Sequence, residues 1–187
     1  DMHLGISVPN IWYRTEIQYG NVHVAGVTLP GIPTMVAGSN EHVAWGATNL
    51  TGDFLDLVTL EINPDNPDQY RVGDKWQHFE QTLESIRVKD NEPVQITVRR
   101  SIWGPVALEP LLDKPVAVHW SALDDKAVNL ELLDLDQAET LEQAMAVVNR
   151  TGGPQLNFLL ADNQGRIGWT VMGQIPRRVG FDGSVSR

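Results

Sequence analysis

The amino-acid sequence predicts an α+β fold, with a mostly antiparallel sheet and helices packed on it. The first observation is a set of short segments in which β-branched residues alternate or cluster between turn signals, at residues 21–29, 93–100 and 115–120. The second is a helical spacing of apolar residues over 139–153. No internal repeat is visible, so we expect residues 1–187 to form a single domain.

The predicted strands show a period of two. Within residues 93–100, Val94, Ile96 and Val98 share one face of an extended chain. Residues 156–173 contain two apolar runs around Asp-Asn-Gln-Gly, which predicts a hairpin. Residues 63–76 are rich in Asn-Pro, Pro-Asp and Gly-Asp steps, and we expect a surface excursion made of turns there.

The predicted helix has a start signal and a stop signal. Thr140 suits the N-cap, and Gln143 follows three residues later as in a capping box. Gly152 and Gly153 end the pattern. A second helix is expected over residues 125–135. The apolar positions that repeat at helical spacing in the first helix are Leu141, Met145 and Val148.

Composition excludes several classes of function. The net charge is −10, from 14 basic and 24 acidic residues, so the chain repels phosphate backbones and we expect no nucleic-acid partner. No run reaches the roughly 20 apolar residues of a membrane helix, and no signal peptide is visible. The absence of cysteine excludes disulfides, thiol catalysis and cysteine-based zinc sites. The chain opens on Asp1 rather than Met, which suggests a fragment of a longer protein.

Short catalytic motifs are missing from the chain. There is no phosphate-binding loop, no G-x-G-x-x-G, no H-E-x-x-H and no G-x-S-x-G. The 5 histidines are scattered singly, a pattern more typical of ordinary surface or core residues than of metal ligands.

Longer segments carry a resemblance. In order along the chain, "DMHLGISVPNIWY", "GVTLPGIPTMVAGSNEHVAWGATNLTGDFLDL" and "NFLLADNQGRIGWTVMGQIPRR" resemble the β subunit of the penicillin acylase family, among the N-terminal nucleophile hydrolases. The resemblance runs from Asp1 to about Arg178. It implies a partial α/β/β/α sandwich, because the rest of the family's sandwich is formed by other segments.

The resemblance also implies a chemistry. Members of the family are secreted precursors that cut themselves into α and β subunits, and the β subunit then begins with a serine. The serine hydroxyl attacks an amide carbonyl while its own α-amino group takes up the proton, which is reasonable for a pKa of about 8. The matching serine would lie upstream of Asp1. We therefore expect this chain alone to hydrolyse nothing.

Two catalytic roles follow from the resemblance. His3 matches a histidine that lies beside the nucleophile and orients the reacting groups in the members that act on cephalosporin side chains and acyl-homoserine lactones. Asn49 matches the position whose backbone N–H stabilises the oxyanion. The alternatives are a half-buried polar residue near the chain start for His3, and an ordinary strand end for Asn49.

Asp53, Leu55 and Asp56 match calcium ligands of the family. The two aspartates would supply carboxylates and Leu55 its backbone carbonyl, and hard oxygen donors suit Ca²⁺. Three donors do not complete a calcium site, so the others would come from the α subunit and from downstream segments. The alternative is a solvated turn capped by an aspartate.

Leu4, Ala37 and Leu156 match residues that line the family's acyl pocket. Leu4 and Ala37 stand where the penicillin G members have aromatic residues, so we expect a pocket for longer or bulkier acyl chains. Trp45 is expected to fill the core, and the glycines Gly38 and Gly46 to allow a tight backbone.

A different class of function stays open. A non-catalytic extracytoplasmic binding domain that retains the fold would fit the same residues. In either case the resemblance implies a periplasmic location. Absent partner strands would leave unpaired sheet edges through which the fragment self-associates.

Overall fold

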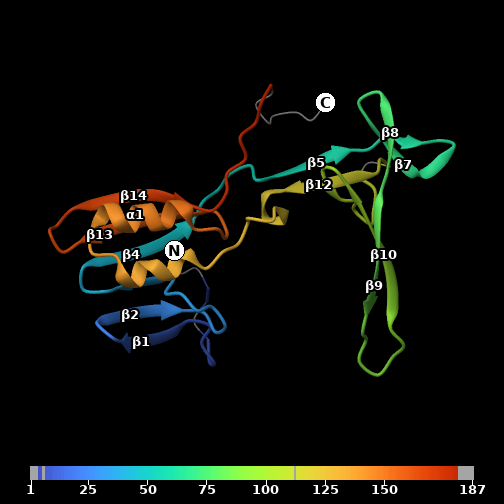
Figure 1. Ribbon diagram of the computed structural model, residues 1–187. Helices are drawn as coiled ribbons and strands as arrows, with labels where there is room; N and C mark the ends of the chain where they lie inside the picture. Colours follow the sequence, from blue (N-terminus) through green and yellow to red (C-terminus); the bar gives the residue numbers. More distant parts are fainter. Residues whose placement is uncertain (1–3, 6, 112, 181–187) are drawn as a thin grey trace. The chain divides into compact units, whose positions relative to one another are not determined.

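The computed structural model describes residues 4–5, 7–111 and 113–180, and the chain divides into two compact units (Figure 1). Unit 1 consists of Asp1–Gly52 and Asp124–Ile175, and unit 2 consists of Asp53–Leu123 and Pro176–Arg187. The single domain expected over residues 1–187 stays a prediction.

Unit 1 is built on a six-stranded sheet with the strand order β1-β2-β3-β4-β13-β14. Every neighbouring pair is antiparallel, which confirms the predicted fold class. The hairpin predicted over residues 156–173 is also confirmed, as β13 and β14. The strands are β1 (Tyr13–Tyr19), β2 (Val22–Thr28), β3 (Ala37–Ser39), β4 (Val43–Asn49), β13 (Leu156–Asp162) and β14 (Ile167–Met172).

The predicted helix is α1 (Leu141–Arg150), and its start is capped as expected. The Gln143 N–H donates to the Thr140 hydroxyl at 3.2 Å, and the Gln143 side-chain oxygen accepts from the Glu139 N–H at 2.8 Å. The first bond satisfies a backbone donor that the helix start would otherwise leave unpaired, and the second reaches the N–H one residue before the N-cap rather than that of the N-cap itself.

The second predicted helix is wrong in extent and type. The structure has a 3₁₀ helix, η2 (Glu131–Gln137), and turns before it. The Asn129 side-chain oxygen accepts from the Glu131 N–H at 3.1 Å, and Asp124 accepts from the Lys126 N–H at 3.3 Å. Such local side-chain bonds offer the backbone an alternative to the helix, which explains the late start.

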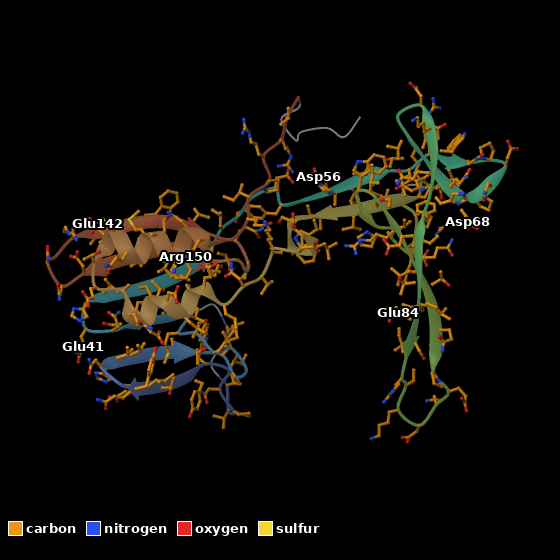
Figure 2. The ribbon with its side chains drawn as sticks, viewed as in Figure 1. Glu41, Asp56, Asp68, Glu84, Glu142 and Arg150 are labelled. Carbon is orange, nitrogen blue, oxygen red and sulfur yellow. The ribbon has the colours of Figure 1, made fainter. Side chains whose placement is uncertain are left out.

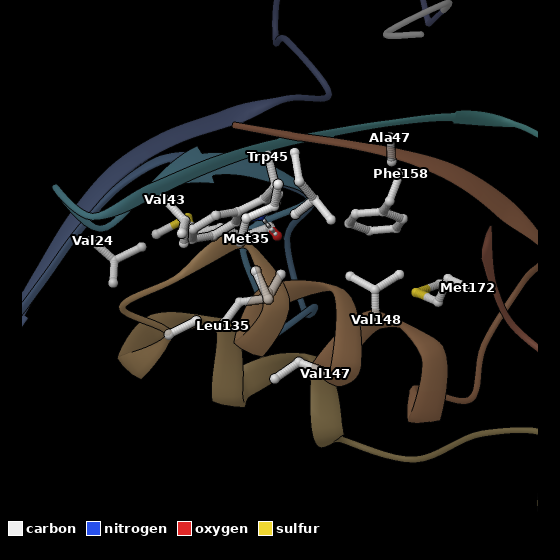
Figure 3. Close-up of a cluster of buried hydrophobic side chains, with 14 residues drawn as sticks. Val24, Met35, Val43, Trp45, Ala47, Leu135, Val147, Val148, Phe158 and Met172 are labelled. Carbon is white, nitrogen blue, oxygen red and sulfur yellow. Dashed lines mark hydrogen bonds between the residues drawn. The ribbon is translucent and has the colours of Figure 1, made fainter. Parts of the chain in front are cut away.

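The core of unit 1 lies between the sheet and the pair α1 and η2, which cover one face (Figure 3). Phe158 from β13 is fully buried there. Trp45 fills the core as predicted, and its indole N–H donates to the Met35 carbonyl at 3.0 Å. Burying each such aromatic side chain stabilises the fold by about 1.5–3 kcal/mol.

Asn40, in the turn between β3 and β4, fastens η2 to the sheet. Its side-chain NH₂ donates to three carbonyl oxygens, those of Leu135 at 2.9 Å, Asp136 at 3.2 Å and Ala138 at 2.8 Å. Its side-chain oxygen accepts from the N–H of His42 and of Val43. Since Asn40 is only 5% exposed, these bonds are shielded from water.

The described part of unit 1 leaves the other face of the sheet open. Leu159, Ile167 and Trp169 point to that side and are 57%, 83% and 59% exposed. The expected tight backbone is confirmed at Gly38, where a Cβ would lie 2.8 Å from the Ala25 carbonyl oxygen. At Gly46 a Cβ would meet no atom of the described residues within 4 Å, so these residues do not require a tight backbone there.

The described residues of unit 2 form three small antiparallel sheets and a 3₁₀ turn, η1 (Ser121–Leu123). Their strands are β5 (Leu55–Thr59) with β12 (Val116–Trp120); β6 (Ile62–Asn63) with β7 (Asn66–Val72) and β8 (Lys75–His78); and β9 (Glu80–Ile86) with β10 (Val94–Ser101) and β11 (Gly104–Pro105).

Turns form at Pro64–Asp65 and at Gly73–Asp74 as expected, but the segment 63–76 is not made of turns alone, because most of it forms β7 and β8. Tyr70 of β7 is 1% exposed and stacks on Phe79 with ring centroids 4.6 Å apart. Trp103 meets Tyr70 edge-on at 5.8 Å. Burial of these rings outweighs the local turn preference. None of the described helices is both long and apolar enough to span a membrane.

Candidate functional site

The backbone of Asn49 lies at the end of β4, and a ladder bond fixes its direction. The Leu50 N–H donates to the Gln155 carbonyl at 3.3 Å. Hydrogen-bonded and non-hydrogen-bonded pairs alternate in an antiparallel ladder, so the next pair, Asn49 with Leu156, is non-hydrogen-bonded. The Asn49 N–H therefore points away from β13, toward the side of β3.

On that side β3 ends short of the level of Asn49. Its last partner in β4 toward that end is Trp45, which pairs with Gly38. The chain beside it bends toward β2, where the Val36 N–H donates to the Val27 carbonyl at 3.0 Å. The Asn49 N–H is thus directed to the end of the sheet, where it suits donation to the oxygen of an incoming carbonyl.

Two further residues, which no sequence motif singled out, hold the carbonyl of Asn49, in the peptide that follows the one carrying the Asn49 N–H. The Asn157 side-chain NH₂ donates to the Asn49 carbonyl at 3.1 Å. The Trp169 indole N–H donates to the Asn157 side-chain oxygen at 3.0 Å. Their sequence signal is only an Asn and a Trp at solvent-side positions of a hairpin, and the pairing depends on the sheet register.

The predicted pocket residues are divided between the two faces of the sheet. Leu156 is the cross-strand partner of Asn49 and packs against the core under the helices. Ala37 pairs with Val27 and points to the open face, because its neighbour Gly38 points to the core side. Leu4 is half-buried ahead of β1. His3 lies outside the described residues.

The predicted metal ligands Asp53, Leu55 and Asp56 lie in unit 2, where Arg178 joins them (Figure 2 labels Asp56). The Arg178 guanidinium lies 3.0 Å from the Asp53 carboxylate and 2.9 Å from that of Asp56. The described residues contain no cluster of three or more histidine, aspartate or glutamate side chains suited to a metal ion. The two carboxylates thus converge on a side-chain cation.

Comparison with known proteins agrees with the resemblance seen in the sequence. The model of the penicillin amidase family matches residues 1–186. The chain belongs to the penicillin amidase family. Among solved structures, it is similar to the thermostable penicillin G acylase from Alcaligenes faecalis, with a TM-score of 0.81, 25% identity and coverage of 92% of this chain and 31% of that chain.

Curated relatives in the penicillin amidase family include two kinds of acyl-homoserine lactone acylase. QuiP from Pseudomonas aeruginosa is 30% identical over 95% of this chain and 23% of that protein. PvdQ from Pseudomonas fluorescens is 24% identical over 84% of this chain and 22% of that protein. The chain therefore spans less than a quarter of the length of these relatives.

Among the described residues, the titratable groups whose pKa is shifted lie on elements other than the end of β4. Burial raises the pKa of the Asp136 carboxyl, to which the Tyr19 hydroxyl donates at 3.3 Å. A backbone hydrogen bond and the guanidinium of Arg166 lower the pKa of Glu142. The Tyr19–Asp136 hydrogen bond connects β1 to η2, and the Glu142–Arg166 ion pair connects α1 to the β13–β14 turn, which indicates structural roles for both.

His23 has a pKa raised by hydrogen bonding to Glu41 and to Glu16. Its Nδ1 lies 3.0 Å from Glu41 and its Nε2 lies 2.6 Å from Glu16, so the protonated ring suits both carboxylates. Stability from this contact should be fully present below about pH 6.5 and lost as the pH rises through the raised pKa of the folded state.

An NMR titration of the ring protons tests this expectation. The His23 midpoint should lie above about 6.5 and should fall in Glu41→Gln. Glu84→Gln, an exposed change in unit 2, should leave the midpoint in place. A midpoint that is the same in all three proteins would contradict the assignment.

Proposed function

We propose that residues 1–187 form part of an amide hydrolase that removes acyl side chains from N-acyl-homoserine-lactone-type or penicillin- and cephalosporin-type substrates. The observation that carries the proposal is the Asn49 N–H at the end of β4, directed away from β13. The names of the relatives, acyl-homoserine lactone acylase and penicillin G acylase, support the substrate class.

In the proposed reaction a terminal serine outside residues 1–187 attacks the amide carbonyl. Negative charge then develops on the carbonyl oxygen, and the Asn49 N–H donates to it. Asn157 holds the Asn49 carbonyl through a hydrogen bond, and Trp169 in turn holds the Asn157 side chain. Because a donor fixed in advance needs no reorganisation, it stabilises the charge in the transition state more than the neutral substrate.

Within the two substrate classes, long acyl chains are favoured. The support is the aliphatic character of Leu4 and Ala37, at positions that are aromatic in the penicillin G members of the family. His3 matches the histidine of the members that act on cephalosporin side chains and acyl-homoserine lactones, which favours the same substrates. A full-length protein that prefers phenylacetyl amides to medium-chain acyl amides would contradict this part of the proposal.

The full-length protein tests the role of Asn49 through a matched pair of substitutions. Asn49→Pro removes the N–H, and we expect the hydrolysis rate to fall by about 10²–10³-fold. Proline is compatible with this position, because the N–H makes no ladder bond to β13 and Thr48 is already extended. Asn49→Ala keeps the N–H and should retain most of the activity.

Rates are measured with penicillin G and with a series of N-acyl-homoserine lactones, and both variants are checked for an unchanged melting temperature. Equal activity of N49P and N49A would exclude the proposed donor. A wild-type protein inert toward every substrate would favour the alternative, an extracytoplasmic binding domain that keeps the fold.

We further propose that an α subunit of the same precursor is the partner and that the protein works in the periplasm. The resemblance to the family is the support for both. The exposed apolar side chains of Leu159, Ile167 and Trp169 are consistent with a covering partner. Among the described strands, β1 and β14 are the edges of the sheet in unit 1, and residues 1–187 alone would self-associate through such edges.

A further inference from the structure

We propose that Arg178 takes the place of a metal ion at Asp53 and Asp56. The family resemblance predicts calcium at these residues. In this chain the positive charge beside the two carboxylates is instead the guanidinium of Arg178. This site would then be held together without calcium.

The guanidinium of Arg178 spans three oxygen atoms. Its Nη2 lies 3.0 Å from Oδ2 of Asp53 and 2.9 Å from Oδ2 of Asp56, and its Nη1 donates to the Asp53 backbone carbonyl at 3.1 Å. A planar fork of donors fits several acceptors at once, whereas a single ammonium group does not.

The contact is partly shielded from solvent, which strengthens it. The side chain of Arg178 is 15% exposed, compared with 27% for Asp56 and 53% for Asp53. Attraction between opposite charges grows as water is excluded. The Arg178 side chain is therefore better shielded from water than the two carboxylates that it contacts.

A calcium ion does not fit beside this arrangement. Calcium requires 6–8 oxygen ligands at about 2.3–2.6 Å, but the Asp56 carboxylate and the Asp53 carbonyl already accept from Arg178, and the Asp53 carboxylate forms an ion pair with it. A dication within a few ångströms of the guanidinium would be repelled. For calcium to bind here, the Arg178 side chain would have to leave its partly buried position beside the two carboxylates.

The contact joins two distant segments of the chain. Asp53 is the first residue of unit 2 after β4, and Arg178 is the third residue of unit 2 after β14. Arg178 lies 125 positions from Asp53 and 122 from Asp56, so its contacts connect these two segments within unit 2. Arg178 thus supplies the cross-link that a structural ion would provide.

The calcium content of the protein tests whether Asp53 and Asp56 bind calcium, and this measurement does not depend on hydrolysis. The full-length wild type and D53N/D56N are saturated with calcium, freed of loosely bound ions by gel filtration and analysed by mass spectrometry of the metal. We expect the same calcium content in both. A calcium ion that the wild type carries and D53N/D56N lacks would overturn the proposal, even if R178Q fails to fold.

Thermal unfolding tests whether the contacts of Arg178 stabilise the fold. R178Q should lower the melting temperature by several degrees, because it leaves two carboxylates facing each other without a cation. R177Q is the matched control, since Arg177 is the exposed neighbour in the same segment, and it should change little. A shift in R178Q no larger than that in R177Q would contradict the proposed cross-link.

Discussion

Replacing Asn40 by aspartate is expected to lower the free energy of unfolding by at least about 3 kcal/mol at neutral pH. The substitution keeps the size and shape of the side chain but exchanges its NH₂ group for a carboxylate oxygen. Three carbonyl oxygens, of Leu135, Asp136 and Ala138, would then face a negative charge instead of a donor. Because the site is buried, water cannot compensate.

The pH dependence distinguishes this cause from a general loss of packing. The introduced carboxyl would have a raised pKa, since burial and the facing carbonyls disfavour its charged form. Its protonated form can donate one hydrogen bond. The difference in stability between N40D and the wild type should therefore shrink as the pH falls below the raised pKa of the new carboxyl.

Urea unfolding followed by tryptophan fluorescence measures the effect, with Asn163→Asp as the control. Asn163 is exposed in the turn between β13 and β14, so the same chemical change should alter stability by no more than about 0.5 kcal/mol. If N40D and N163D unfold at similar urea concentrations, Asn40 does not fasten η2 to the sheet.

Phe158→Ala is expected to cost about 3–5 kcal/mol. Phe158 is 0% exposed, and its ring lies among side chains of the sheet and of α1, including Val148 (Figure 3). The substitution removes apolar contacts and leaves a cavity that the surrounding backbone cannot fully close.

Leu159→Ala is the matched control for Phe158→Ala. Leu159 follows directly in β13 but points to the open face and is 57% exposed, so its truncation should cost much less in this chain. Comparing the two urea midpoints tests which face of the sheet forms the core. Equal costs would contradict the one-sided core of unit 1.

The sequence by itself determined the local elements of this protein. The start of α1 follows from Thr140 and Gln143, whose bonds involve residues only three or four positions apart. The β13–β14 hairpin follows from two apolar runs and a turn. The long ordered motifs also identified the family, because many residues in a fixed order carry more information than one short pattern.

Tertiary contacts decided where local preferences were overruled. The pattern of residues 63–76 predicts turns, yet most of this segment forms β7 and the start of β8, because Tyr70 is buried. The helix expected over residues 125–135 starts only at Glu131 and is 3₁₀, because Asn129 and Asp124 bind nearby backbone N–H groups instead.

The candidate site shows the same division. Sequence motifs placed Asn49, Asp53 and Asp56 on a family pattern, and Asn49 does end a strand. Only the folded chain brings Asn157 to the Asn49 carbonyl, 108 positions away, and Arg178 to Asp56, 122 positions away. Local patterns report the preferences of neighbouring residues, whereas such partners depend on strand order and register, which no short stretch of sequence contains.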